Sequence, residues 1–312
     1  MMSHTNGSAV LVGQPTEQDL LQSFERKQQL IRDRVASVVY RYHTAAYLVG
    51  RPGTSKTHTI REELERLEEP WVYQNARMTP MGLFGFIAEH PEHIIVLDDI
   101  ASLFRNDQAV QILLAALDGK PSEPRVVTYK SADVEQKVLF TGSVIAISNV
   151  PLRADPLARA LGSRIVVLEH EPTDDEIAAF MRHLALDGFE DLSVNECVEV
   201  AEFIISETRE FNLRLDLRHL AKAFQDFRQH KHGRSQTSWR DLVRTSVRKL
   251  AIEPITITSK KDEIEVQRQK VRHAITKFPH DRHSQIAESG LKQSTFYNRL
   301  KEVQAEAAST AA

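Results

Sequence analysis

The stretch Ala45-Ala46-Tyr47-Leu48-Val49, followed directly by Gly50-Arg51-Pro52-Gly53-Thr54-Ser55-Lys56-Thr57, decides the fold of this 312-residue chain. The five apolar residues form the short continuous run that is typical of a buried parallel strand. Glycine and proline then indicate a tight loop, and residues 57–67 have the pattern of a helix. A loop at a helix N-terminus directs unpaired backbone N–H groups and the positive end of the helix dipole at an anion. The sequence therefore predicts a phosphate-binding loop between a strand and a helix.

Each residue type in this loop suits contact with a nucleotide, because glycines allow the backbone to curl around phosphate without a Cβ in the way. Lys56 would reach the β- and γ-phosphates, and the Thr57 hydroxyl would bind Mg²⁺. Ser55 stands where a final glycine is expected; it fits if its backbone is helical, and it could crowd the phosphate. The residues expected to contact the nucleotide are Gly50, Pro52, Gly53, Thr54, Ser55, Lys56 and Thr57. The competing interpretation is an ordinary Gly/Pro turn followed by a helix.

Two aspartates, Asp98 and Asp99, directly follow a second apolar run at residues 94–97. This places two carboxylates at the C-terminal edge of an inner strand, where ligands of open α/β sheets bind. Asp98 would hold Mg²⁺ through water, and Asp99 would orient or deprotonate the attacking water. Glutamate is more common at the second place, and the shorter aspartate could slow hydrolysis. The alternative for Asp99 is a cap for the next helix.

Asn149 closes a further apolar run at residues 144–147. Its amide could touch both the attacking water and the γ-phosphate, although an asparagine after a strand is usually a turn former. The order of phosphate loop, acidic strand and asparagine strand along the chain favours the functional interpretation. The alternation of apolar runs with helical stretches predicts an α/β fold with a mostly parallel sheet flanked by helices. The other apolar runs lie at residues 71–73 and 165–168, and the other helical stretches at 20–40 and 108–117.

Only helical periodicity remains after Pro172, which predicts an all-α region beyond the α/β domain. We expect a disordered N-terminal segment (1–19), an α/β core (20–170), a helical domain (171–250), and a linker with a small helical module (251–312). Charge is divided unevenly within the helical domain. Residues 171–206 hold ten acidic residues and one basic residue, whereas residues 207–250 hold eleven basic and five acidic residues. The basic stretch could bind a polyanion, or it could balance the acidic segment as a solvated helical face; the sequence leaves both open.

Taken together, residues 45–168 resemble the AAA+ ATPase superfamily. Residues 50–57 are similar to its Walker A loop apart from Ser55, residues 94–99 to its Walker B element, and Asn149 to its sensor 1. The resemblance implies a P-loop ATPase that uses ATP and Mg²⁺. It also implies a two-part nucleotide site that is completed by oligomerisation, commonly in a hexameric ring or spiral.

The resemblance further implies two arginines. One reaches into the nucleotide site of the neighbouring subunit, where it stabilises charge on the transferring phosphoryl group. Arg164 is similar to that element, with Arg159 as a second candidate; the alternative for Arg164 is a surface arginine at a strand start. The helical domain would be the family's lid, whose second sensor arginine is Arg218, with Arg214 as the fallback.

Residues 282–300 resemble a helix-turn-helix, with residues 271–278 as the supporting helix and Gly290 in the turn. The positions expected to be buried are Ile286, Ala287, Leu291, Phe296 and Leu300. The exposed positions suited to DNA phosphates and base edges are Lys292, Gln293, Ser294, Thr295, Tyr297, Asn298 and Arg299. The net charge of residues 251–312 is small, so electrostatics alone would bind DNA weakly. A protein-docking helical hairpin is the alternative.

The composition fits a globular protein, with 41% apolar and 27% charged residues and a net charge of −3. A wholly disordered chain, a collagen and a disulfide scaffold are excluded, because apolar content is high and Cys197 is the single cysteine. No apolar run approaches the roughly 20 residues of a membrane span, and the N-terminus lacks a secretory signal pattern. We therefore expect a cytoplasmic protein without a membrane partner. Residues 82–86 could be a substrate-gripping loop, but aromatic residues of a core helix are the favoured interpretation.

These observations predict an ATPase that couples its nucleotide state to DNA-associated assembly, as replication initiators, helicase loaders and transposition ATPases do. Its expected partners are copies of itself, DNA, and a helicase or another replication or transposition protein. A slowly hydrolysing, nucleotide-dependent scaffold for a partner protein and a DNA helicase motor are the alternatives.

Overall fold

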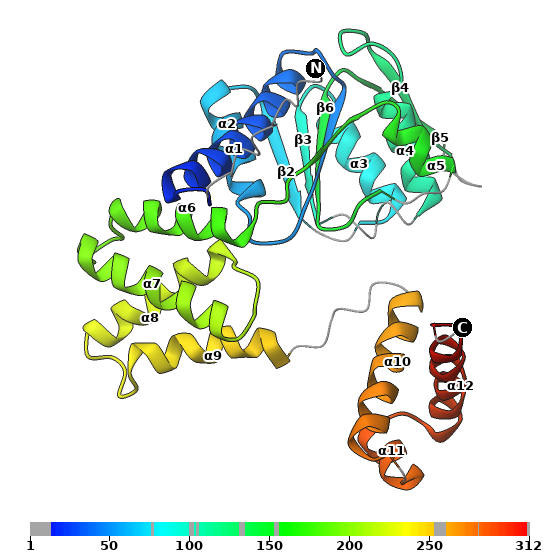
Figure 1. The fold of residues 1–312 in the computed structure, drawn as a ribbon. Helices are drawn as coiled ribbons and strands as arrows, with labels where there is room; N and C mark the ends of the chain where they lie inside the picture. The colour runs from blue at the N-terminus through cyan, green and yellow to red at the C-terminus, as the bar shows by residue number, and fades with distance from the viewer. Residues whose placement is uncertain are drawn as a thin grey trace, which may run out of the picture. The chain divides into compact units, whose positions relative to one another are not determined.

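The computed structural model describes residues 14–75, 78–99, 103, 106–130, 135–152, 156–252, 260–279 and 281–310. The chain forms two compact units, residues 1–247 and residues 248–312. The first unit contains a sheet with its flanking helices and a helical lid, and the second contains three helices (Figure 1).

The central sheet of the first unit has five strands in the order β2-β3-β6-β1-β7, and every neighbouring pair is parallel. The strands are β1 (Ala45–Val49), β2 (Trp71–Asn75), β3 (Ile94–Asp98), β6 (Ser143–Ser148) and β7 (Val166–Glu169). The three inner strands are the apolar runs of the sequence, and their described side chains are almost wholly buried. This parallel sheet between helices confirms the predicted fold class.

Helices cover both faces of the sheet, because side chains of a strand alternate between its two faces. α1 (Glu17–Val39) and α2 (Lys56–Leu67) pack on the face that includes Ala46 and Leu48. α3 (Pro80–Glu89), α4 (Asp107–Leu117) and α5 (Pro156–Gly162) lie on the opposite face, with Tyr47.

The first helix begins earlier than the sequence indicated. Residues 1–13 lie outside the described residues, but residues 17–19, which we expected to be disordered, form the first turn of α1. Thr16 and Asp19 form a capping box that satisfies the free N–H groups of that turn. The boundary therefore follows the capping residues rather than the first apolar position, Leu20.

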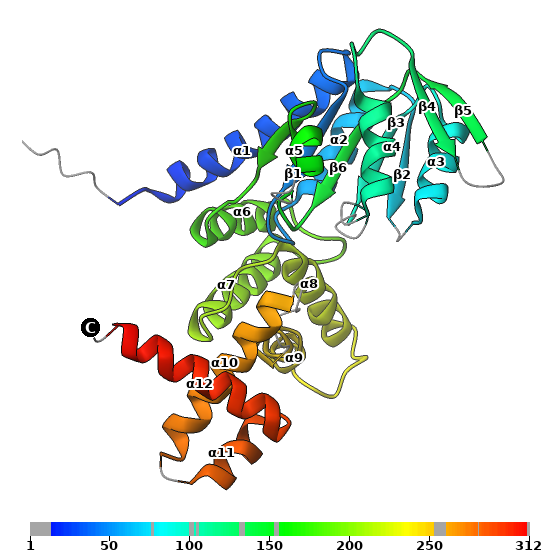
Figure 2. The same ribbon diagram turned by 90° about the vertical axis from the view of Figure 1, so that its right-hand side faces the viewer.

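The structure adds a two-stranded antiparallel sheet that the sequence analysis did not predict. It pairs β4 (Arg125–Lys130) with β5 (Glu135–Phe140) and packs beside α3 and α4 (Figure 2). Val127 and Phe140 contribute to the core, whereas the facing side chains of the other sheet surface are exposed. In α3, Leu83 and Phe84 are fully buried, so the core-helix interpretation of residues 82–86 is confirmed.

The lid has a hydrophobic core of its own, built by four helices. These are α6 (Asp174–Leu186), α7 (Val194–Glu210), α8 (Leu217–Lys231) and α9 (Trp239–Ile252). At least six lysines and arginines of the basic stretch form ion pairs inside the lid, almost all with the acidic stretch: Arg209, Arg214, Arg228, Lys231, Arg240 and Arg244. The acidic and basic stretches thus balance each other within the lid, and binding of a polyanion by the basic stretch stays a prediction.

The second unit consists of α10 (Lys260–Lys277), α11 (Arg282–Ser289) and α12 (Gln293–Thr310). Val271, Phe296 and Leu300 form its core, and Gly290 ends α11 with φ of 62°, the left-handed value that glycine adopts without strain.

The prediction that Ala287 is buried in this unit is wrong. Ala287 is exposed, and the residues buried on α11 are Gln285 and Ser289. These two lie four residues apart and therefore on one face of the helix. Both remain satisfied, because the Gln285 amide donates to the Phe278 carbonyl at 2.5 Å and the Ser289 hydroxyl donates to the Ile286 carbonyl at 2.8 Å.

Among the described residues, every helix is too short or too polar to cross a bilayer.

Candidate nucleotide-binding site

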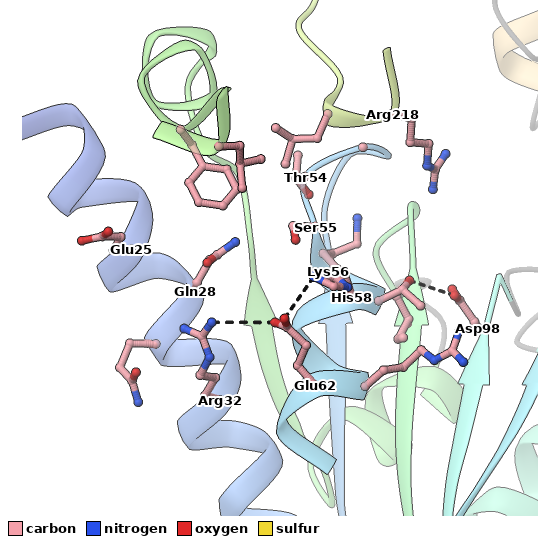
Figure 3. Close-up of a pocket in the computed structure, with 18 of the residues that line it drawn as sticks. Glu25, Gln28, Arg32, Thr54, Ser55, Lys56, His58, Glu62, Asp98 and Arg218 are labelled. Atoms are coloured by element: carbon pink, nitrogen blue, oxygen red, sulfur yellow. Dashed lines mark hydrogen bonds and ion pairs between the residues drawn. The ribbon is translucent and has the colours of Figure 1, made fainter. Parts of the chain in front are cut away.

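The glycine-containing loop lies where β1 ends and α2 begins, at the C-terminal edge of the parallel sheet. A cavity of about 1350 Å³ opens over this edge and is lined by the loop, by β3 and β6, and by helices of the core and the lid (Figure 3). The expected residues Gly53, Thr54, Ser55, Lys56 and Thr57 all line it. The backbone N–H groups at the start of α2 make this a favourable place for an anion.

Lys56 is drawn back onto its own loop. Its ammonium donates to the carbonyl oxygens of Gly50 and Arg51, both at 2.6 Å, and lies 3.4 Å from Asn149 Oδ1. The side chain is almost completely buried, and this burial lowers the pKa of Lys56 to about 8. Burial thus disfavours the charged ammonium, and an anion beside it would stabilise that form.

Ser55 does not have the helical backbone that we expected would accommodate it. Its φ of 71° and ψ of 6° lie in the left-handed region, where glycine is favoured. Gly53 has a similar φ of 72°, and a Cβ there would clash with the carboxylate of Asp216. The loop therefore requires a left-handed backbone at two positions, 53 and 55, and glycine occupies only the first of them.

Thr57 and Asp98 lie together, as predicted for a shared magnesium site. The Thr57 hydroxyl donates to Asp98 Oδ2 at 2.9 Å, and the Tyr73 hydroxyl donates to the same oxygen at 2.8 Å. Hydroxyl and carboxylate oxygens are the ligands that Mg²⁺ prefers, so this donor set fits the ion. Tyr73 orients the carboxylate from the neighbouring strand, a contact that sequence reasoning missed because it depends on the pairing of β2 with β3.

Asp99 and Asn149 both line the cavity, at the ends of β3 and β6. The Asp99 backbone N–H donates to Asp98 Oδ1 at 2.9 Å, and its φ is 53°. The alternative function of Asp99 as a helix cap gains no support, because Asn106 caps the next described helix, α4. Asn149 faces Lys56, so the third predicted element meets the first.

The structure separates the two lid arginines. Arg218 lines the cavity, whereas Arg214 is directed to an ion pair with Asp174 at 2.9 Å. Arg218 lies in the first turn of α8, which Asp216 caps by accepting the Arg218 N–H at 2.7 Å. The position of the two side chains thus favours Arg218 over Arg214 as the arginine that the lid contributes to the cavity.

Arg164 lies at the N-terminal end of the parallel strands, opposite the end that carries the phosphate loop. It precedes β7, whereas the phosphate loop follows β1, and the two strands are parallel. The Arg164 guanidinium pairs with Asp118 at 2.9 Å and donates to the Ala160 carbonyl at 2.8 Å. Arg164 therefore does not line the cavity of its own chain. Arg159 lies in the last turn of α5.

Sequence reasoning missed the part of the cavity wall formed by α1 and α6. Gln28 lies on the apolar face of α1 between Phe24 and Ile31, and it is buried at the cavity edge (Figure 3). Phe180 and Leu184 of α6 supply an apolar surface on the lid side. A buried glutamine within an apolar helical face was the available signal, because such an amide requires a polar partner.

In the second unit, most of the expected DNA-contacting positions are exposed or partly exposed at the start of α12: Lys292, Gln293, Ser294, Thr295, Tyr297 and Asn298. Arg299 differs, because its side chain is only 17% exposed. Its guanidinium pairs with Glu302 at 2.6 Å and donates to Gln267 at 3.0 Å. Arg299 therefore packs α12 against α10 in this structure, in contrast to the free side chain that we expected.

No family model matches the chain, and no curated protein matches it. Solved structures do match, 469 chains in all. One is a point mutant of RuvB from Thermotoga maritima, with 14% sequence identity, a TM-score of 0.47, and coverage of 91% of this chain and 87% of that chain. A likeness at that level says nothing about activity. The sheet order, the loop after β1 and the polar strand ends give the protein the P-loop NTPase fold that the AAA+ resemblance implies.

Proposed function

We propose that the chain binds ATP with Mg²⁺ and hydrolyses it. One observation carries this proposal: Lys56, Thr57, Asp98, Asn149 and Arg218 converge on a single cavity from four separate parts of the chain. Three of these parts are strand ends at one edge of the sheet, where α/β proteins bind their ligands. The fourth is the lid.

The chain's own groups suit phosphoryl transfer to water. Lys56 would leave the carbonyls of its loop and bind the terminal phosphates, and Thr57 and Asp98 would hold Mg²⁺, which neutralises phosphate charge when bound. Asp99 and Asn149 would orient the attacking water. Arg218 would contact the phosphates from the lid, so that lid position depends on the nucleotide.

We further propose that the site is completed by a second copy, through Arg164, in a ring or spiral. Its position supports this, because Arg164 precedes β7 whereas the phosphate loop follows the parallel strand β1, at the opposite end of the strands. The nucleotide state would then control assembly.

The α10–α12 unit would place that assembly on DNA, as in replication initiators, helicase loaders or transposition ATPases. The exposed polar positions at the start of α12 support this, together with the exposed cation Lys292 directly before it. Lys292→Ala is therefore expected to weaken binding to duplex DNA at moderate salt. Arg299→Ala should act mainly by loosening the packing of α12, and unchanged DNA binding in both variants would remove the DNA assignment.

ATPase activity measured across protein concentration, with and without duplex DNA, tests the whole proposal. Turnover per chain should rise with concentration and again with DNA, and Lys56→Ala should abolish it. If the purified protein fails to bind ATP, or if Lys56→Ala retains hydrolysis, the proposed activity is wrong.

A nucleotide-dependent scaffold is the second candidate, favoured by the strained backbone of Ser55 and by the shorter carboxylate of Asp99. Such a protein would bind nucleotide and partner protein with little turnover. Nucleotide binding without hydrolysis, at every concentration and with DNA present, would identify this function.

A further inference from the structure

Arg51 connects the phosphate loop to the lid. Its side chain is mostly buried and donates to the carbonyl oxygens of Leu215 and Pro172, both at 3.1 Å. It also pairs with Asp174 Oδ1 at 2.7 Å. These partners belong to the two segments that enter the lid, one from the core and one leading into α8.

The backbone of the same residue contacts the group that would bind phosphate. The Arg51 carbonyl accepts from the Lys56 ammonium at 2.6 Å and from the Thr54 hydroxyl at 3.1 Å. The Arg51 N–H donates to Glu171 Oε1 at 2.7 Å. One residue thus links the loop ammonium to the base of the lid.

A second contact holds the same lid segment against the loop. The Leu217 N–H donates to the Gly53 carbonyl at 3.0 Å, and the Asp216 carboxylate leaves no room for a Cβ on Gly53. Leu217 begins α8, which carries Arg218 in its first turn. Within segment 213–217, Leu215 contacts Arg51 and Leu217 contacts Gly53, so a movement of the loop backbone would be passed to Arg218 through this segment.

We propose that Arg51 is a positioning residue that couples phosphate occupancy of the loop to the position of segment 213–217, and thereby to Arg218. A triphosphate competes with the Arg51 carbonyl for the Lys56 ammonium, and charged hydrogen bonds of this kind are strong enough to shift the loop. The guanidinium fork transmits that shift to Leu215 and Asp174. The inference rests on the proposed function, because it requires a triphosphate in the cavity.

Hydrogen exchange of the full-length protein, with and without Mg²⁺ and a non-hydrolysable ATP analogue, tests this coupling at residues 213–219. In the wild type, the analogue should change the exchange of these amides. In Arg51→Ala their exchange without nucleotide should be about ten- to a hundredfold faster, the effect of losing charged hydrogen bonds. The response to the analogue should also be lost.

Arg209→Ala is the matched control, because Arg209 forms a lid ion pair with Asp175 at 2.8 Å but does not touch the loop. It should respond to the analogue as the wild type does. Arg51→Lys keeps the charge but cannot span two carbonyls and a carboxylate, so only part of the response should return. If Arg51→Ala does not fold, Asp174→Asn removes the guanidinium's carboxylate partner and should reduce the response in the same way.

The coupling is overturned if Arg51→Ala keeps the wild-type response, or if a wild type that binds the analogue shows no change at residues 213–219. Equilibrium dialysis with the analogue separates the two proposals. If the wild type binds none, the proposed function fails. The exchange measured without nucleotide then tests only the contact between Arg51 and the lid. If residues 213–219 exchange equally fast in Arg51→Ala and Arg209→Ala, that contact does not hold the segment, and the inference is overturned.

Discussion

Ser55 stores backbone strain at the N-terminus of α2. Its left-handed backbone is held by Thr59, whose N–H and hydroxyl both donate to the Ser55 carbonyl at 3.0 Å. A left-handed conformation costs an ordinary residue about 1 kcal/mol or more. Such strain persists only where surrounding structure enforces it, and here the enforcing structure is the curl of the loop around its anion position.

Ser55→Gly should therefore raise the free energy of unfolding by about 0.5–1 kcal/mol, after the greater chain entropy of glycine is subtracted. Urea denaturation measures this change. Glu68→Gly is the control, because Glu68 ends α2 with φ of 57° outside the cavity. Both variants should be stabilised, but only Ser55→Gly should alter nucleotide affinity. A destabilised Ser55→Gly would contradict the assigned conformation.

The lowered pKa of Lys56 predicts that nucleotide binding is coupled to the uptake of a proton. This pKa of about 8 without nucleotide leaves roughly half of the lysine neutral at pH 8. Phosphate favours the ammonium and raises this pKa, so binding at pH 8 should take up roughly half a proton. Affinity should consequently fall as the pH rises above about 8.

Calorimetric titration in buffers of different ionisation enthalpy measures this uptake. At pH 6.5 the lysine is already charged, and its contribution should vanish. Binding heats that are independent of the buffer at pH 8 would show that Lys56 does not gain its proton on binding.

At the scale of elements, the α10–α12 unit depends on a very small core. Phe296 is fully buried between Val271 and Leu300, and few other apolar side chains accompany it. A unit of this size has little stability to lose.

Phe296→Ala should cost about 3–5 kcal/mol and unfold this unit, because truncation leaves a cavity that three helices cannot close. Loss of exchange protection across residues 271–304 of the full chain would show it, while the sheet of the first unit stays protected. Tyr297→Ala is the control, since Tyr297 is 40% exposed and its loss should change stability by less than about 0.5 kcal/mol. Equal effects of the two substitutions would disprove the packing.

At the scale of the whole molecule, Lys56 and Arg164 lie at opposite ends of two parallel strands, because Lys56 follows β1 and Arg164 precedes β7. If each active site needs both, the two must come from different copies. This requirement distinguishes an assembled ATPase from a monomeric one.

Mixing Lys56→Ala with Arg164→Ala tests the requirement, with each variant alone expected to be inactive. In an equimolar mixture, roughly one quarter of the sites would combine an intact Lys56 with an intact neighbouring Arg164, as random pairing in a closed ring gives. Turnover measured above the assembly concentration should recover to that extent. No recovery would remove Arg164 from the site, and Arg159 would become the residue to test.

The parallel sheet, the glycine-containing loop between strand and helix, and the helical region after Pro172 follow from local patterns of the sequence. Short continuous apolar runs bounded by turn residues favour buried strands, and a Gly/Pro loop before a helix leaves the first N–H groups of that helix free. The β4–β5 hairpin escaped because its strands are short and partly polar. The alternation of buried and exposed side chains along the hairpin depends on Val127 and Phe140, which pack into the core of the folded chain.

The partners of side chains that lie far apart in the sequence follow only from the folded chain. The tertiary structure paired Tyr73 with Asp98, Arg51 with Asp174 and Arg299 with Gln267, and it paired the basic lid stretch with the acidic one. It also gave Ser55 its left-handed backbone. The physical reason is the same in each case: periodicity and local propensity act within a few residues, whereas hydrogen-bond and ion-pair partners are chosen by the packing of whole elements.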